Sequence, residues 1–430
     1  MKYRLCALLA TATAWPCMSF AQEHVAINSG DTAWMLTSTV LVILMCLPGL
    51  ALFYGGLVRT KNMASVLTQI FVIFCLISLL WVVYGYSLTF GGEGLVWANL
   101  DLAFLHGVRP DTVSRALPNI PEFVWIAFQN AFAALTVALA VGAFAERIKF
   151  SAVIIFAVIW FTFSYIPVAH MIWGGGWMAE DGALDFAGGT VIHLNAGVAA
   201  LVGAYMLGKR QGFGTVNMAP HNLTLTMVGG ALLWVGWFGF NAGSAGAADG
   251  VAGLAFINTI LATSVGTLAW LMTEWMIKGK PSLLGAVSGA IAGLVGITPA
   301  AGFVGPMGAI VIGLLCGPAC VWGVSGLKRL LRVDDVCDVF GVHGVAGLIG
   351  AVLTGVFVSP VLGGVGVDDY NMLRQVWVQL ESALITMVIS AVVTYLAFVV
   401  ARFTVGVRVT EQEEQLGLDL ATHGESAYHA

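Results

Sequence analysis

Eleven long apolar stretches separated by short polar segments dominate this sequence. Nearly all of them approach or exceed the ~20 residues that an α-helix needs to cross the ~30 Å hydrocarbon layer of a bilayer. They run approximately over residues 33–58, 64–90, 120–144, 151–173, 186–208, 222–244, 251–277, 282–298, 302–327, 340–358 and 376–403. The eighth is the shortest. We therefore predict an all-α polytopic membrane protein with eleven transmembrane helices.

The composition excludes other classes. Of the 430 residues, 59% are apolar and only 10% are charged, against about a quarter charged in a soluble domain. A net charge of −5 spread over many loops leaves no basic stripe for nucleic acid. The 53 glycines have no collagen-like period. Gly285, Gly289 and Gly293 instead form a small-residue face of the kind that lets membrane helices pack closely.

The N-terminal residues have the features of a secretory signal. Lys2 and Arg4 precede a short apolar run, and Ser19 and Ala21 put small residues at the two positions that a signal peptidase reads. A retained first membrane helix is the alternative, but the run is well below the ~20 residues of a span. We predict a signal peptide at 1–21 cleaved after Ala21, a transmembrane domain at 22–403 and a C-terminal tail at 404–430.

Basic residues predict the orientation. Thirteen of the eighteen Lys and Arg residues fall in segments on one side of the eleven helices, three fall on the other side, and two lie in the signal. The positive-inside rule then places the mature N-terminus outside and the tail inside the cell. The outer loops are acidic, which either concentrates cations or is ordinary loop solvation.

Two predicted helices share a pattern around a histidine. Residues 191–197 and 341–347 match at His193 and His343 and at the Ala-Gly pair that follows three residues later. In the predicted topology these helices run in opposite directions and close two five-helix halves. This favours an inverted five-helix repeat plus a long final helix, a plan of many transporters. Chance similarity between Gly/Ala-rich helices is the alternative.

The paired histidines are candidates for chemistry. An ionisable residue deep in a membrane is costly and is by default a functional hypothesis, although a neutral core imidazole bonded to a backbone carbonyl is the bland alternative. Neutral imidazoles exchange protons or line a path for a small polar molecule. As a repeat-related pair, His193 and His343 favour function.

Aromatic residues gather near the predicted outer boundary. They are Phe128, Phe132, Trp173, Trp237 and Phe240, with the Ser244 hydroxyl one turn beyond Phe240. Belt tryptophans and packing phenylalanines are the usual explanation. Because aromatic faces also bind cations, an outer cation site is the second hypothesis. Asp185 opens the fifth helix and is interpreted first as a cap of its free amides.

Five segments resemble the Amt/Mep/Rh ammonium transporter family, specifically its bacterial Amt branch. They are residues 48–56, 145–147, 185–193, 237–244 and 340–344. The Asp-Phe-Ala-Gly-Gly-x-x-x-His run at 185–193 is the most specific. The resemblance covers the chain from about residue 30 to its end.

The resemblance implies a homotrimer in the inner membrane of a bacterium, with one pore in each subunit and a role in nitrogen utilisation. By analogy, Phe132, Trp173 and Ser244 bind ammonium (or methylammonium) at an outer site. Phe132 and Phe240 form a gate, and His193 and His343 form the pore and proton relay. Asp185, Phe128 and Trp237 have supporting roles.

A bare cation in a dry apolar pore costs several kcal/mol or more, so we expect ammonium to be deprotonated and to cross as ammonia, and the resemblance implies net proton transfer. A passive ammonia channel and an ammonium sensor are the alternatives. Sensors of the family carry an added signalling domain, which a tail of under thirty residues cannot house. We expect no enzyme, metal or cofactor site, because no histidine begins an HExxH motif and no nucleophile elbow is recognisable.

The end of the chain carries a second resemblance. Residues 422–430 resemble the tail of Amt proteins that are regulated by a PII-type signalling protein, which implies such a partner at the cytoplasmic face. The acidic run 411–414 would ordinarily be a solvated end.

Overall fold

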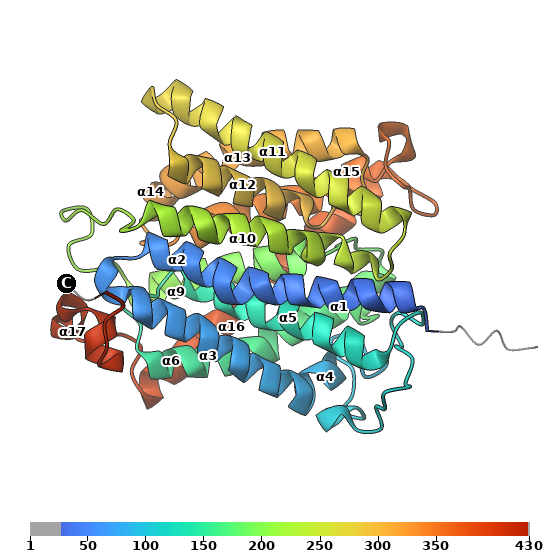
Figure 1. The fold of residues 1–430 in the computed structure, drawn as a ribbon, viewed down its shortest axis with the longest axis horizontal. Helices are drawn as coiled ribbons and strands as arrows, with labels where there is room; N and C mark the ends of the chain where they lie inside the picture. The colour runs from blue at the N-terminus through green and yellow to red at the C-terminus, as the bar shows by residue number, and fades with distance from the viewer. Residues whose placement is uncertain (1–26, 429–430) are drawn as a thin grey trace, which may run out of the picture.

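The computed structural model describes residues 27–428, so the predicted signal peptide lies outside the described residues. In that range, ten helical segments are long and apolar enough to cross a membrane, and a shorter apolar helix lies among them. Together they account for the eleven predicted helices (Figure 1). The prediction of an all-helical polytopic membrane protein is confirmed.

The helices follow one another in chain order. They are α1 (Ser29–Leu44), α2 (Ala51–Leu57), α3 (Met63–Leu80), α4 (Tyr86–Phe90), α5 (Glu122–Val141), α6 (Phe150–Trp160), α7 (Ile166–Trp173), α8 (Trp177–Glu180), α9 (Asn195–Leu207), α10 (Leu223–Asn241), α11 (Gly250–Lys278), α12 (Leu283–Ile297), α13 (Pro306–Trp322), α14 (Lys328–Leu331), α15 (Val345–Phe357), α16 (Met372–Thr404) and α17 (Glu411–Leu416). The eighth predicted span, α12, is the shortest of the eleven.

Wide π-helical turns interrupt or begin several spans. One of them, Met45–Leu50, joins α1 to α2 and contains Pro48, whose missing amide and ring break the regular ladder. Two others begin spans: Gly189–Leu194 leads into α9 and Phe340–Gly344 into α15. These two turns contain His193 and His343. Such turns are rare and often mark functional sites.

The two histidine-bearing spans run in opposite directions. The described chain begins at one end of the bundle and ends at the other, as an odd number of crossings requires (Figure 1). α9 leads to a loop at the C-terminal end of the bundle, whereas α15 leads to a loop at the opposite end. Each π-helical turn packs against the helix of the other half, as the inverted repeat predicts.

Glycines allow some helices to touch along their backbones. On α12, a Cβ added to Gly293 would lie 2.2 Å from the Ala262 carbonyl oxygen on α11, and one added to Gly289 would lie 2.9 Å from that of Gly266. The predicted role of this small-residue face in close packing is confirmed. The backbones of α11 and α12 are therefore in close contact.

Candidate functional site

A pocket of about 280 Å³ opens at the end of the bundle where α1 begins. Phe132, Trp173 and Ser244 all line it, as do Trp125 and Gln129. The structure thus gathers the three residues of the predicted outer site from α5, the end of α7 and the segment after α10. Aromatic faces and a hydroxyl are groups that hold a small cation without a formal counter-charge.

Hydrogen bonds fix two of these side chains. The Trp173 indole nitrogen donates to the Asp185 carbonyl oxygen over 2.8 Å. The Ser244 hydroxyl donates to the Phe240 carbonyl oxygen over 2.8 Å, so its lone pairs remain available as acceptors. The pocket is therefore preorganised, with the Ser244 hydroxyl oxygen available as a hydrogen-bond acceptor beside aromatic rings.

Asp185 acts as the predicted cap. Its two carboxylate oxygens accept the backbone amides of Gly188, Gly189, Thr190 and Val191 over 2.7 to 2.9 Å. Burial raises the pKa of this carboxyl to about 6, against the effect of the four amides. Asp185 thus holds the turn that carries His193 and lies beneath the outer pocket through its bond to Trp173.

A column of rings leads inward from the pocket. Phe132 and Phe240 stack at 4.3 Å with their planes 5° apart, and Phe240 lies 5.7 Å from His193. Phe128 supports Phe132 from 4.7 Å. All four side chains are buried. The stacked rings therefore lie between the outer pocket and His193.

The two histidines continue the column. Their Nδ1 atoms lie 3.2 Å apart and their rings 5.2 Å apart. Within residues 27–428 neither ring is hydrogen-bonded to a backbone carbonyl. The alternative of core imidazoles bonded to backbone carbonyls therefore does not describe this pair. Trp237 stacks on His193 at 5.1 Å and donates its indole proton to the Thr298 hydroxyl over 2.9 Å.

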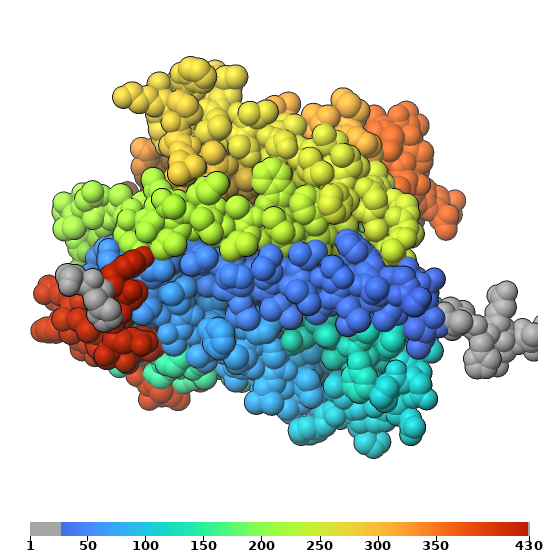
Figure 2. Space-filling view, viewed as in Figure 1, coloured from blue at the N-terminus to red at the C-terminus, as the bar shows by residue number. Residues whose placement is uncertain are grey.

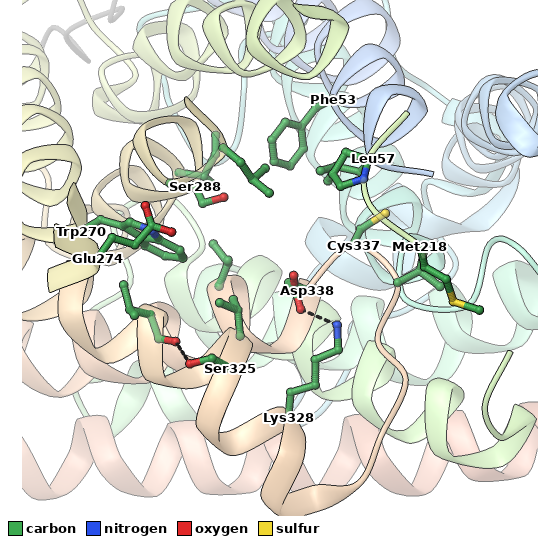
Figure 3. Close-up of a pocket in the computed structure, with 18 of the residues that line it drawn as sticks. Phe53, Leu57, Met218, Trp270, Glu274, Ser288, Ser325, Lys328, Cys337 and Asp338 are labelled. Carbon is green, nitrogen blue, oxygen red and sulfur yellow. Dashed lines mark hydrogen bonds and ion pairs between the residues drawn. The ribbon is translucent and has the colours of Figure 1, made fainter. Parts of the chain in front are cut away.

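The column ends at an inner cavity of about 400 Å³. His343 is one of its lining residues, and Phe53 and Leu57 form an apolar wall (Figure 3). The remaining lining combines further apolar residues with polar ones, including Glu274 and a Lys328–Asp338 ion pair of 2.8 Å. The molecule therefore holds two cavities at opposite ends, separated by phenyl and imidazole rings.

A buried ion network ties the segments around the inner mouth together. The Glu146 carboxylate pairs with Arg210 over 2.6 Å and with Arg59 over 3.0 Å, and Arg210 also pairs with Asp334 over 2.8 Å. Burial alone raises the pKa of Glu146, but the charges of Arg210 and Arg59 outweigh it and hold the pKa below its ordinary value. Sequence reasoning missed this network.

The tail packs against the same end of the molecule. Glu414 is buried, pairs with Arg408 over 2.8 Å and accepts the Gln211 amide. Asp419 accepts the amides of Ala64 and Ser65 at the start of α3. Figure 2 shows this red segment against the blue surface at the end of the molecule opposite to where the described chain begins. Glu414 is thus packed against the protein, whereas Glu411 at the start of the acidic run is exposed as its charge suggests.

Sequence reasoning also missed Trp125, Gln129 and Asp335. Trp125 lies seven residues before Phe132 on α5 and so faces the same pocket; this helical spacing could have found it. Asp335 lies eight residues before His343, just as Asp185 lies eight before His193. Its Oδ2 accepts the Phe340 amide over 2.9 Å. The repeat therefore also includes an aspartate eight residues before each histidine, which the sequence comparison did not recognise.

Two cavities joined by a buried ring column in a membrane-spanning bundle define a membrane transport protein. A model of the Ammonium Transporter Family matches residues 33–428. This chain belongs to that family. It is a multi-pass ammonium transporter, and not an enzyme, whose substrate is ammonium or ammonia.

Relatives and solved structures agree with this assignment. The chain is 47% identical to an ammonium transporter of Bacillus subtilis, covering 93% of this chain and 98% of the relative. It is 46% identical to one of Aquifex aeolicus, covering 96% of both. It resembles the crystal structure of Candida albicans Mep2 at 34% identity and a TM-score of 0.82, covering 90% and 88%. A sensor Amt protein is similar at 28% identity and a TM-score of 0.84, covering 91% and 98%.

Proposed function

We propose that Phe132, Trp173 and Ser244 bind ammonium in the outer pocket, that ammonium loses a proton there, and that ammonia passes Phe240 and the two histidines to the inner cavity. The observation that carries this mechanism is the unbroken row of rings between the two cavities. Neutral imidazoles and phenyl rings carry no formal charge. The row therefore favours an uncharged molecule over a cation.

This arrangement separates ammonium from potassium. The two ions have similar size and charge, so a hole matched to the ion cannot discriminate between them. Moving a bare cation through a low-dielectric passage costs several kcal/mol or more. Ammonium avoids that cost by giving up its proton and crossing as ammonia, whereas potassium has no such route.

The histidine pair supplies a route for that proton. The 3.2 Å contact between the two Nδ1 atoms is within the range over which imidazoles exchange a proton. We expect the proton to cross by this pair, so that transport is electrogenic. A passive ammonia channel would return the proton to the outside, and a sensor would bind ammonium with little transport.

The cellular setting completes the proposal. The charge distribution favours a periplasmic mature N-terminus, a cytoplasmic tail and a bacterial inner membrane. A signal peptide cleaved after Ala21, a transmembrane domain at 22–403 and a tail at 404–430 remain predictions, as does the homotrimer. A PII-type protein at the cytoplasmic face would meet the inner cavity and the docked tail.

Charge movement in proteoliposomes tests the mechanism. An ammonium jump should give a transient current in the wild type, and a potassium jump of the same size should give none. His193→Ala and His343→Ala should each lose the current, because either change breaks the relay. Leu396→Ala, on the exposed face of α16, is the matched control and should keep it.

A pH-sensitive dye inside the vesicles separates the alternatives. Ammonia entry without current would replace the electrogenic mechanism by a passive channel. Ammonium binding with neither current nor entry would identify a sensor. Equal currents with potassium and ammonium would contradict deprotonation.

A further inference from the structure

His170 is a buried titratable residue that the mechanism proposed above does not use. Its Nδ1 atom lies 2.7 Å from the Thr89 carbonyl oxygen, and its Nε2 atom lies 2.8 Å from the Gly94 carbonyl oxygen. Within residues 27–428 it is the one histidine whose two ring nitrogens both contact backbone carbonyls. This pair of contacts limits how the ring can be protonated.

A neutral imidazole cannot satisfy both contacts. It has one N–H donor and one bare nitrogen, whereas a carbonyl oxygen can only accept a hydrogen bond. Either neutral tautomer would hold a nitrogen lone pair against a carbonyl oxygen and leave that buried acceptor without a donor, which is costly. An imidazolium has a proton on each nitrogen and donates to both oxygens. The contacts therefore match the charged form of His170.

The surroundings of the ring also favour a charge. His170 lies in the last turn of α7, where the partial negative charge of a helix C-terminus stabilises a cation. A Cβ added to Gly174 would lie 2.4 Å from Nδ1, and one added to Gly176 would lie 3.2 Å from Cδ2. Backbone thus encloses the ring, and the two carbonyl oxygens are the partners that its nitrogens contact directly.

The bonds of His170 connect the end of α7 to α4 and to the segment 91–98. Trp173 lies three residues later on α7 and lines the outer pocket, where its indole nitrogen donates to the Asp185 carbonyl oxygen. Residues three apart on a helix are neighbours on its surface. A shift of the end of α7 would therefore move an aromatic wall of the pocket.

We propose that His170 is an imidazolium at neutral pH and positions Trp173 in the outer pocket through its two carbonyl bonds. The positioning role rests on the outer ammonium site proposed above, whereas the charge of the ring does not. Loss of a proton at alkaline pH removes one donor and releases either α4 or the segment 91–98 from α7. Trp173 is then held less firmly, and ammonium binding weakens.

Other charged or titratable groups lie on the elements that pack against α7 and on the segment 91–98. They are Tyr86, Glu93, Tyr165, Glu180 and His193, and the Arg115 guanidinium donates to the Gly91 carbonyl oxygen. Within residues 27–428 none of them forms an ion pair with His170. Carboxylates, tyrosines and arginines ordinarily titrate outside the range of about pH 6 to 9. Replacing His170 therefore separates its titration from that of His193.

Solid-state NMR of the full-length protein in lipid vesicles tests the charge of the ring without a substitution. Isotopic labels on the histidine ring nitrogens and on the threonine carbonyl carbons should identify His170 through its contact with Thr89. At neutral pH both of its ring nitrogens should carry a directly bonded proton. A bare ring nitrogen at neutral pH would overturn the proposal.

The pH dependence of methylammonium uptake tests the positioning role. Methylammonium stays charged up to about pH 9, as the alkylamine of lysine does. With equal pH on both sides of the vesicle membrane, the wild-type KM should rise about fivefold or more from about pH 6 to 9, because a hydrogen bond from a charged group is lost. His170→Gln has no titrating proton, so its KM should be high already at the lower pH and should not rise further.

Two further variants complete the test. His106→Gln, in an exposed outer loop, is the matched control and should keep the wild-type pH profile. A wild-type KM that falls with rising pH, or a His170→Gln profile equal to that of the wild type, would overturn the positioning role. An unchanged KM in Trp173→Leu would overturn the outer site together with that role, while NMR would still decide the charge of His170.

Discussion

The two histidine-bearing segments of this transporter are similar in sequence but differ in the hydrogen bonds and rings that hold them. Each has an aspartate eight residues before its histidine and a π-helical turn around it. Asp185 accepts four amides, whereas Asp335 accepts the Phe340 amide with Oδ2, and its Oδ1 has no hydrogen-bond partner among residues 27–428. His193 is buried between rings, while His343 opens to the inner cavity.

The difference teaches that an inverted repeat conserves geometry where the halves meet and not at the mouths. Each half needs a π-helical turn that presents its histidine to the place where the two halves meet. The outer half then continues into an aromatic pocket, and the inner half into a cavity lined by both apolar and charged side chains. The following changes should break or sharpen this comparison.

Removing the capping carboxylates should give the largest contrast. Asp185→Ala leaves four buried amides without acceptors, at about 1–3 kcal/mol each, and should lower methylammonium uptake by about 100-fold or more. Asp335→Ala removes far less support and should lower it by about tenfold or less. Uptake is normalised to folded protein by size-exclusion chromatography. Equal losses would show that the caps are equivalent.

The repeat-related glycines should give the next contrast. A Cβ at Gly197 would lie 2.6 Å from the Gly344 amide nitrogen, whereas one at Gly347 would lie 2.9 Å from the Gly189 carbonyl oxygen. Overpacking against backbone costs about 1–3 kcal/mol, so Gly197→Ala should lower thermal stability more than Gly347→Ala. Gly253→Ala, which meets open space, should not lower it. The reverse order for Gly197 and Gly347 would contradict the described contacts.

Trp237 supports only one of the two histidines. Trp237→Phe keeps a ring against His193 but removes the bond to Thr298, which should slow the ammonium-dependent current by about three- to tenfold. Trp234→Phe, one turn earlier on α10, removes an indole whose nitrogen has no partner and serves as the control. A current unchanged by Trp237→Phe would mean that the indole bond does not position His193.

The smallest effect concerns pH. Burial and the charge of Asp338 raise the pKa of Asp335. Folding therefore disfavours the ionised carboxyl. The resulting loss of stability is absent below the ordinary pKa of 3.8 and reaches its full size above the raised pKa. Asp335→Asn should gain thermal stability relative to the wild type as pH rises from about 4 to 8. Asp368→Asn in an exposed loop should show no such trend.

Much of this site could be predicted from the sequence, because depth and spacing along a helix are local properties. His193 and His343 stand out as ionisable residues in apolar spans, and Phe132 and Ser244 stand out by their place near a span boundary. Trp125, which lines the outer pocket, was missed although its spacing from Phe132 along the helix indicates it.

The remainder depends on distant partners. Glu146 meets Arg210, 64 residues away, and Asp419 caps a helix more than 350 residues earlier. Periodicity cannot report such pairs. Nor can it report a π-helical turn, since a local widening of the helix leaves the apolar character of the run unchanged. The eight-residue spacing from Asp335 to His343 was visible in the sequence. It becomes meaningful only when it is compared with the same spacing from Asp185 to His193.

The sizes of the two cavities bear on the direction of flow. One molecule confined to the inner 400 Å³ is equivalent to a local concentration of about 4 M, and one in the outer 280 Å³ to about 6 M. These values differ by less than twofold and far exceed any cellular ammonium concentration. The two volumes therefore give no reason for flow in one direction rather than the other. A net direction must therefore come from the gradients across the membrane.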